Sequence, residues 1–207
     1  RCIAAVGATA RAHHNGDMSV PPVVYEGVYG PYTVTGEHRR EVLAYRLSLL
    51  LVAMAQVALL VQWRWLGPSW CWPWLLLMAA GLGGALRWVH IYLVPLHRTL
   101  QLFWLLGCVG FGLLAYRAGA ASMLPQLVDQ PVWIWLVGPF FAALAGLGFK
   151  EFFCFQRPEA IGLTLLLPLL LLGWWLGLWS ASVASVLLAA QSLLLMVLAL
   201  RKFPMPE

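Results

Sequence analysis

Ionisable side chains that could do chemistry are few in this sequence, and eight of them stand beside long apolar stretches. Arg87 and His90 lie three residues apart, so they would share one face of a helix. His90 or His97 could ligate the metal of a haem or chlorophyll. Together the eight could form a salt-bridged collar that fixes helix ends, or a docking surface for a partner protein, an anionic lipid headgroup or a pigment tail. The full set is Arg87, His90, His97, Arg98, Lys150, Glu151, Arg157 and Glu159.

The pattern of these residues does not match the active site of a known class of enzyme. The sequence contains no His-Glu-x-x-His pair for zinc and no Gly-x-Ser-x-Gly nucleophile elbow. The cysteines Cys2, Cys71, Cys108 and Cys154 lack the paired spacing of metal or redox sites. We therefore expect a protein that is not an enzyme and that needs no metal or cofactor.

The elements that must position the charged residues are membrane helices. Hydrophobic residues make up 62% of the 207 residues, charged residues make up 10%, and the mean hydropathy is +0.80. A soluble domain is about 45–50% apolar and about 25% charged. This composition excludes a soluble enzyme, a disordered regulator and a secreted disulfide scaffold. The net charge of +5 is not gathered into a basic run or helical face, so we expect the lipid bilayer, and no nucleic acid, as partner.

Six apolar stretches are long enough to cross a bilayer core of about 30 Å, which takes about 17–25 helical residues. They are continuously apolar and do not alternate with polar residues, which favours helices over strands. The second stretch contains Arg87 and His90, so its hydrophobic part is expected to end near Leu86. We predict an all-α membrane protein with six transmembrane helices. The stretches are 42–61, 72–94, 100–116, 132–149, 161–179 and 181–200.

Lysine and arginine alternate between the two sides of these stretches. Only Arg64 and Arg117 fall on one side, and nine cations fall on the other. By the positive-inside rule this bias predicts that both termini face the cytoplasm or the stroma of a plastid. The tryptophans of the opposite side are expected to form an interfacial belt. The nine cations are Arg39, Arg40, Arg46, Arg87, Arg98, Lys150, Arg157, Arg201 and Lys202.

The middle thirds of the six stretches contain no ionisable residue. Their most polar residues include Gln56, Thr164, Ser185 and Gln191. Ion-coupled transporters usually keep carboxylates or broken helices near the membrane midplane. Their absence weighs against active transport, while a pathway for a small neutral solute stays open.

Two patterns concern the packing of the helices. Gly138, Ala142 and Gly146 recur every four residues, so they share a helical face on which backbones can approach closely. The last two stretches are separated only around Ser180. We therefore predict an internally packed bundle that ends in a tight antiparallel hairpin.

One stretch carries a resemblance to a known family. The residues Gly148-Phe-Lys-Glu-Phe-Phe-Cys-Phe-Gln-Arg-Pro-Glu159 resemble the signature of an uncharacterised integral-membrane family of cyanobacteria and plastids (domain of unknown function 2301). Similar stretches occur at 24–35, 90–104 and 200–202, so the resemblance runs from about Val20 to the end. It implies a photosynthetic organism and a plasma or thylakoid membrane. The family has no assigned activity, so the resemblance implies no catalytic residue.

The expected organisation has four parts. Residues 1–17 precede the first methionine, Met18, and are expected to be a non-native or disordered extension. Residues 18–41 form a cytoplasmic segment, 42–202 the six-helix domain and 203–207 a short tail. The function hypothesis is a non-enzymatic scaffold or assembly-type factor beside a complex of photosynthetic membranes. The alternatives are a small-solute carrier or channel and a tetrapyrrole-binding membrane protein.

Overall fold

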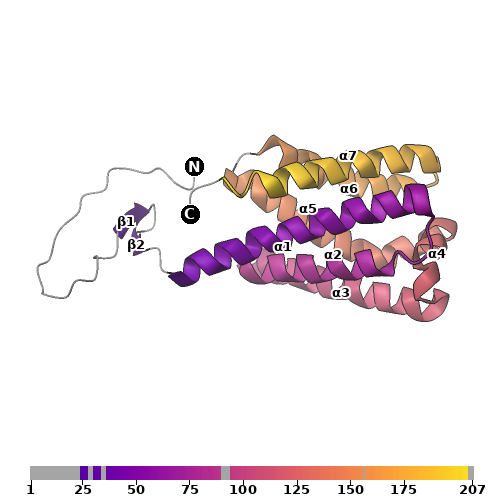
Figure 1. Cartoon of the computed structure of the whole chain (residues 1–207), viewed down its shortest axis with the longest axis horizontal. Coiled ribbons are helices and arrows are strands. Elements are labelled where there is room, and N and C mark those ends of the chain that lie inside the picture. Colours follow the sequence, from indigo (N-terminus) through magenta and orange to yellow (C-terminus); the bar gives the residue numbers. More distant parts are fainter. Residues whose placement is uncertain (1–23, 28–29, 34–35, 90–93, 156, 205–207) are drawn as a thin grey trace, which may run out of the picture.

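A computed structural model describes residues 24–27, 30–33, 36–89, 94–155 and 157–204 (Figure 1). Near the amino end, β1 (Val24–Gly27) and β2 (Gly30–Thr33) pair as an antiparallel hairpin. The rest of the described chain is an elongated bundle of helices. The all-α prediction holds for the bundle, and the small hairpin lies in the segment 18–41, for which the sequence predicted no regular element.

Six long helices run along the bundle, and each overlaps one of the six predicted stretches. Five of them are long and apolar enough, by length and composition, to cross a membrane. The other, α2, has 17 residues and is not in that group; it ends at Trp88, close to the predicted hydrophobic limit. The helices are α1 (Gly36–Val61), α2 (Trp72–Trp88), α3 (Val94–Ala118), α5 (Ile134–Phe155), α6 (Pro158–Trp175) and α7 (Ala181–Leu200).

Consecutive long helices run antiparallel to one another (Figure 1). One turn of π-helix (Gln62–Leu66) extends α1, and the short helix α4 (Met123–Asp129), which was not predicted, joins α3 to α5. The predicted tight hairpin is present between α6 and α7. The side chain of Ser180 caps α7 by accepting a hydrogen bond from the Val183 amide at 3.3 Å.

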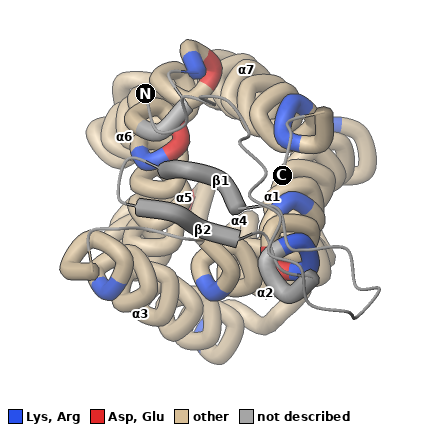
Figure 2. The backbone as a smooth tube through the Cα atoms, turned by 90° about the vertical axis from the view of Figure 1, so that its left-hand side faces the viewer, with Lys and Arg blue, Asp and Glu red and all other residues tan. Residues whose placement is uncertain are grey.

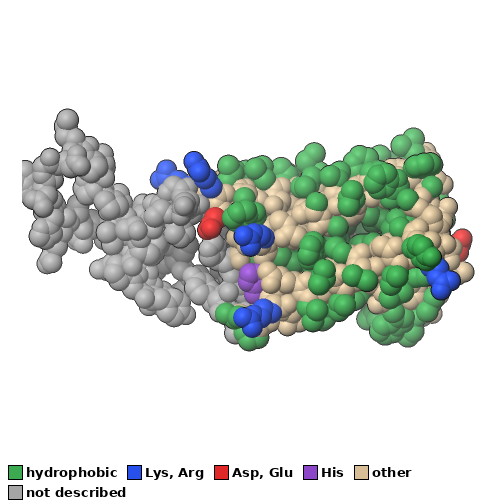
Figure 3. All heavy atoms as spheres, turned by 90° about the horizontal axis from the view of Figure 1, so that it is seen from below, with side chains coloured by type: hydrophobic (Ala, Val, Ile, Leu, Met, Phe, Trp, Pro, Cys, Tyr) green, Lys and Arg blue, Asp and Glu red, His purple; other side chains and the backbone are tan. Residues whose placement is uncertain are grey.

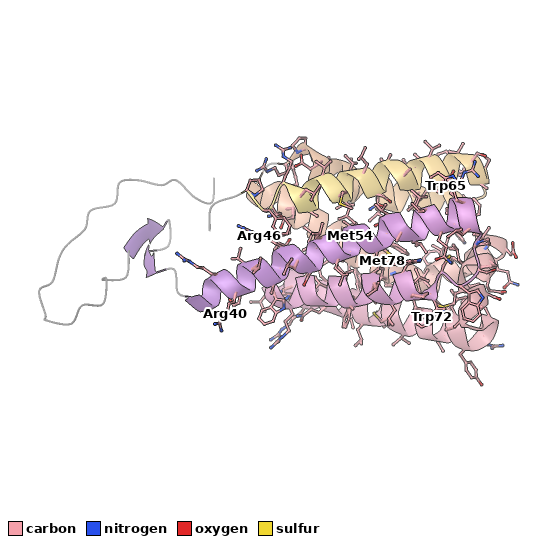
Figure 4. The ribbon with its side chains drawn as sticks, in the orientation of Figure 1. Arg40, Arg46, Met54, Trp65, Trp72 and Met78 are labelled. Atoms are coloured by element: carbon pink, nitrogen blue, oxygen red, sulfur yellow. The ribbon has the colours of Figure 1, made fainter. Side chains whose placement is uncertain are left out.

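This arrangement creates two different ends. Arg40 and Arg46 lie at one end and Trp65 and Trp72 at the other (Figure 4). We name the first, which holds the start of α1 and the end of α7, the charged end, and the second the tryptophan-rich end. Large apolar side chains are exposed along the flank between them (Figure 3), as expected of a surface that faces lipid.

Small residues bring pairs of helices into close contact. A Cβ atom added at Gly81 or Gly84 of α2 would lie only 2.8 Å from Val52 Cγ2 or 2.6 Å from Ser48 Oγ, both on α1. A Cβ atom at Gly110 of α3 would overlap the carbonyl group of Leu136 on α5. These glycines let backbones approach closely, as small residues do between helices in lipid.

The predicted small-residue face of α5 is only partly a packing face. A Cβ atom at Gly146 would meet the side chain of Leu100 on α3, so this position does pack against a neighbouring helix. At Gly138 the nearest atom would be 3.9 Å away, and both Gly138 and Ala142 line an apolar groove. The prediction was therefore wrong for Gly138 and Ala142, because helical spacing fixes a common face without fixing what that face meets.

Candidate functional site

The antiparallel order of the helices brings charged residues from the ends of all six long helices described above to the charged end. Figure 2 looks onto this end and shows Lys and Arg on several helix termini around the Asp and Glu positions. Seven of the eight predicted residues lie among the described residues, and His90 lies outside them. The seven do not form one cluster; the structure divides them into separate sets.

The most buried set is built around Glu151, in the last turn of α5, whose side chain is 0% exposed. The Tyr45 hydroxyl of α1 donates a hydrogen bond to Glu151 Oε1 at 2.5 Å. Lys150 Nζ lies 3.2 Å from the same oxygen, and Lys202 Nζ forms an ion pair with Oε2. A charge buried from water is stable only with such partners. We name Tyr45, Lys150, Glu151 and Lys202 the Glu151 cluster.

The ring of Tyr45 adds a second kind of contact to the cluster. Lys150 Nζ and Lys202 Nζ lie 5.5 Å and 5.7 Å from the ring centroid, within the range of cation–π attraction. One tyrosine thus contacts the carboxylate through its hydroxyl and both ammonium groups through its ring. The contacts join α1, α5 and the turn after α7, so the cluster holds the ends of three helices together.

A second set ties the end of α7 to neighbouring helices. Arg201 Nη1 lies 3.1 Å and 3.2 Å from the two carboxylate oxygens of Glu159. Glu159 stands in the first turn of α6, where the helix dipole also favours a negative charge. Arg46 of α1 donates a hydrogen bond to the Phe203 carbonyl at 3.3 Å. Glu151 and Glu159, the carboxylates buried at the charged end among the described residues, are therefore both engaged with cations.

His97 caps a neighbouring helix. Its Nε2 atom lies 2.7 Å from the carbonyl oxygen of Leu86, in the last turn of α2, where carbonyl groups lack partners within the helix. A carbonyl oxygen can only accept, so Nε2 carries a proton and donates it there. The amide of Gln101 lies 3.1 Å from the same nitrogen. In this arrangement Nε2 is not free to bind a metal.

The remaining predicted residues are arginines with fewer contacts. Arg87 and Arg98 are exposed, and within the described part of the chain neither has a carboxylate partner. The Arg87 guanidinium lies 5.7 Å from the ring centroid of its neighbour Trp88. Arg157 is half-buried at the N-cap of α6.

The set of predicted site residues omitted Tyr45, Arg46, Arg201 and Lys202. In the sequence the last three serve only as evidence for orientation. The usable signal was the position of Arg201 and Lys202 directly after an apolar stretch, because the end of the last helix must lie beside the ends of its neighbours. Tyr45 gave no such signal, since an aromatic residue near a helix end fits an interfacial position equally well.

No three His, Cys, Asp or Glu side chains among the described residues lie close enough to hold a metal ion. Cys71, in the loop before α2, is buried, and burial raises the pKa of its thiol. A raised pKa keeps the thiol protonated and lowers its reactivity at neutral pH.

A second buried polar site lies between α1 and α7. The Gln56 side-chain amide donates hydrogen bonds to Gln191 Oε1 and, at 3.1 Å, to the Ser192 hydroxyl. The Ser192 hydroxyl donates to the Leu188 carbonyl at 2.7 Å. The other amide atoms, Gln56 Oε1 and Gln191 Nε2, are buried and have no partner in the described structure. We name Gln56 and Gln191 the amide pair.

Comparison with known proteins gives one match, which is to the sequence profile of a family. The profile of a family described as uncharacterized integral membrane proteins matches residues 84–207, which include α3, α5, α6 and α7. No curated protein and no solved structure matches the chain.

Proposed function

Because the chain belongs to this family of uncharacterized integral membrane proteins (domain of unknown function 2301), we propose that it is a non-enzymatic scaffold or assembly factor that docks a partner membrane protein at its charged end. The observation that carries the proposal is the contrast between paired and unpaired cations there. Lys150, Lys202 and Arg201 have carboxylate partners, whereas the exposed Arg87 and Arg98 have none among the described residues.

The geometry of arginine indicates the kind of partner. A guanidinium group presents a planar set of donors that matches a carboxylate, and arginine is enriched at the centres of protein interfaces. Arg87 ends α2 and Arg98 begins α3, so the two flank one connection between helices. The partner is therefore a protein with an acidic surface near the membrane.

The buried contacts of the same end make it a rigid platform. The Glu151 cluster joins α1, α5 and the end of α7, and the Glu159–Arg201 pair joins α6 to α7. Side chains held by several partners keep one geometry, which is what a docking surface needs. Both carboxylates are engaged, so neither is free as a general base, and this supports a non-catalytic role.

The proposal includes six membrane spans with both termini on the cytoplasmic or stromal side. The 17 residues of α2 stand at the lower limit of about 17–25 for a span, and α2 lies alongside α1 (Figure 1). The nine-to-two distribution of cations supports the orientation. The family resemblance of the sequence supports a plasma or thylakoid membrane of a photosynthetic organism.

The test is purification of the tagged full chain from native membranes in a mild detergent. A stoichiometric partner protein should accompany the natural chain and fall at least about tenfold in R87Q/R98Q, because charged interface pairs contribute several kcal/mol. The matched control is R64Q/R117Q, which removes two exposed cations from the tryptophan-rich end and should retain the partner.

Three outcomes would count against the scaffold. The chain could be recovered alone, the partner could be retained equally by both double variants, or a Soret absorbance could show a bound tetrapyrrole. An absorption spectrum of the same sample therefore distinguishes the pigment-binding alternative from the scaffold.

A further inference from the structure

An apolar cavity lies at the centre of the tryptophan-rich half of the bundle, where side chains of all six long helices line it. Its volume is about 120 Å³, and its walls are almost entirely carbon. Gln56 is part of the lining, but its amide is buried against Gln191 and Ser192. A polar ligand would lose its hydrogen bonds to water in such a cavity without gaining new ones, which costs free energy. The cavity therefore suits a hydrocarbon.

The size of the cavity suits a few carbon atoms. An engineered cavity of about 150 Å³ lined by aliphatic and aromatic groups stays dry and binds benzene. Lipid chains are as apolar as these walls, so transfer from water does not drive their entry from the bilayer. Packing can drive it, because the atoms around an empty space forgo dispersion contacts and the cost of an empty cavity rises with its volume. A hydrocarbon that fills the cavity removes this cost.

A groove on the flank of the bundle runs beside the cavity. It has a volume of about 320 Å³, and α3, α5 and α6 line it. On both α5 and α6 the lining residues recur at i, i+3 and i+7, so the groove follows these helices for two turns, about 10 Å. Lipid chains run in the same direction when the helices cross a bilayer. The residues are Trp135, Gly138 and Ala142 of α5 and Pro168, Leu171 and Trp175 of α6.

A single layer of side chains lies between the groove and the cavity. Ile134, Phe141 and Leu171 line both hollows. Between them the groove is open at Gly138, where an added Cβ atom would lie 3.9 Å from its nearest neighbour. A hydrocarbon chain in the groove can thus reach the cavity by displacing this layer.

We infer that the cavity binds the end of a lipid hydrocarbon chain that enters from the groove. The chain lies along α5 and α6, and its headgroup end is near Trp135 and Trp175, whose ring centroids are 5.1 Å apart in an edge-to-face contact. Tryptophan is enriched at the level of the lipid headgroups, which sets this direction. The last carbons of the chain pass the layer of Ile134, Phe141 and Leu171 into the cavity.

This site goes beyond the scaffold role and does not depend on it. Arg87 and Arg98 lie at the charged end, whereas the cavity reaches Trp63 and Met123 at the other end. Failure of partner docking in R87Q/R98Q would leave lipid binding unchanged, and the reverse also holds.

The experiment uses the full chain in phosphatidylcholine nanodiscs that contain a phosphatidylcholine with a photoactivatable diazirine at the end of one acyl chain. After irradiation, mass spectrometry locates the adducts. Leu165 and Leu167 lie near the middle of α6, and their side chains are 63% and 1% exposed. Leu165 reports contact with the surrounding bilayer, whereas Leu167 lines the cavity and reports a chain inside it. Adducts are expected at both residues.

The variant A184F fills the cavity from α7, because Ala184 lines the cavity and is buried. Adducts at Leu167 should fall at least about fivefold relative to those at Leu165, because the new ring takes the space and the contacts of the chain end. The matched control A190F places the same ring at an exposed position of α7 and should be labelled as the natural chain is.

Two results would overturn the inference. The first is a natural chain with adducts at Leu165 and none at Leu167, as expected if the cavity is empty or a second copy of the chain covers the groove. The second is an A184F variant labelled at Leu167 as strongly as the natural chain. The first comparison uses no variant, so it decides the matter even if A184F does not fold.

Discussion

The Glu151 cluster and the amide pair are both polar groups enclosed by an apolar bundle, yet their hydrogen bonding differs. The carboxylate of Glu151 receives a hydroxyl and two ammonium groups from three parts of the chain. The two glutamines satisfy one amide atom each with the other residue and leave one atom each unpaired. The first site has a partner for each carboxylate oxygen, whereas the second leaves one atom of each amide without a partner among the described residues.

This difference predicts different contributions of the two sites to stability. A buried polar group that lacks a partner costs free energy, whereas a paired one contributes modestly. The cluster thus stabilises the contact between helix ends. This is consistent with the rigid docking surface that we propose for the charged end. The amide pair leaves a donor and an acceptor unsatisfied among the described residues, so we expect it to contribute less to stability than the cluster does.

The largest effect is expected when the complete site is broken. The variant E151Q leaves Lys150 and Lys202 largely buried beside a neutral amide. Removing one partner from a buried ion pair costs about 3–5 kcal/mol. We expect the free energy of unfolding to fall by that amount, measured by equilibrium unfolding in mixed detergent micelles.

Two further variants make that measurement specific to the Glu151 cluster. Replacing the exposed Asp129 at the other end with asparagine should change the free energy of unfolding by less than about 0.5 kcal/mol. Adding K202M to E151Q should recover part of the loss, because it removes one buried ammonium group. If E151Q lowered the free energy of unfolding by less than about 1 kcal/mol, the cluster would not stabilise the contact between helix ends.

Variants of the amide pair are expected to change the free energy of unfolding less. The single variant should lower it, and the double variant should leave it unchanged or raise it. Q56L alone leaves Gln191 Oε1 without the donor that it had, so the whole Gln191 amide is buried and unpaired, which costs about 1–3 kcal/mol. Q56L/Q191L removes both amides and should be as stable as the natural chain or more stable, in the same unfolding assay. A double variant that loses more stability than Q56L would show that the pair stabilises the bundle. The amide pair and the Glu151 cluster would then not differ in their effect on stability.

The positions of the helices were predictable, because apolar length and short loops are local properties of the sequence. All six predicted stretches correspond to helices, and the tight turn at Ser180 is present. The partners within each site were not predictable in this way. Glu151 and Tyr45 are 106 residues apart, and their contact depends on the rotation of α1 and α5 about their axes. Gln56 and Gln191 were recognised as polar residues, but nothing local indicated that they would meet.

The role of His97 was also not predictable from the sequence, because its partner is set by the fold. As a histidine near a membrane surface it fitted a metal ligand, and a lone histidine in sequence offers no way to exclude this. The structure gives it a partner eleven residues earlier, the Leu86 carbonyl that the end of α2 leaves unpaired. The capping role follows from the distance between two helix ends, which appears only after folding.

The smallest change in the free energy of unfolding is expected at the Glu159–Arg201 pair. Its two single variants test whether burial of the carboxylate or attraction between the charges sets the cost of breaking the pair. In the Glu159–Arg201 pair the arginine side chain is 51% exposed and the glutamate side chain is 5% exposed. E159Q leaves an arginine that water can solvate, so we expect a loss of less than about 1 kcal/mol. R201Q leaves a buried carboxylate without its cation, and its loss should be larger than that of E159Q in the same unfolding assay. Equal losses in the two variants would mean that Coulomb attraction alone sets the cost. The larger loss in R201Q would mean that desolvation of the carboxylate sets it, the same cause that makes Glu151 need three partners.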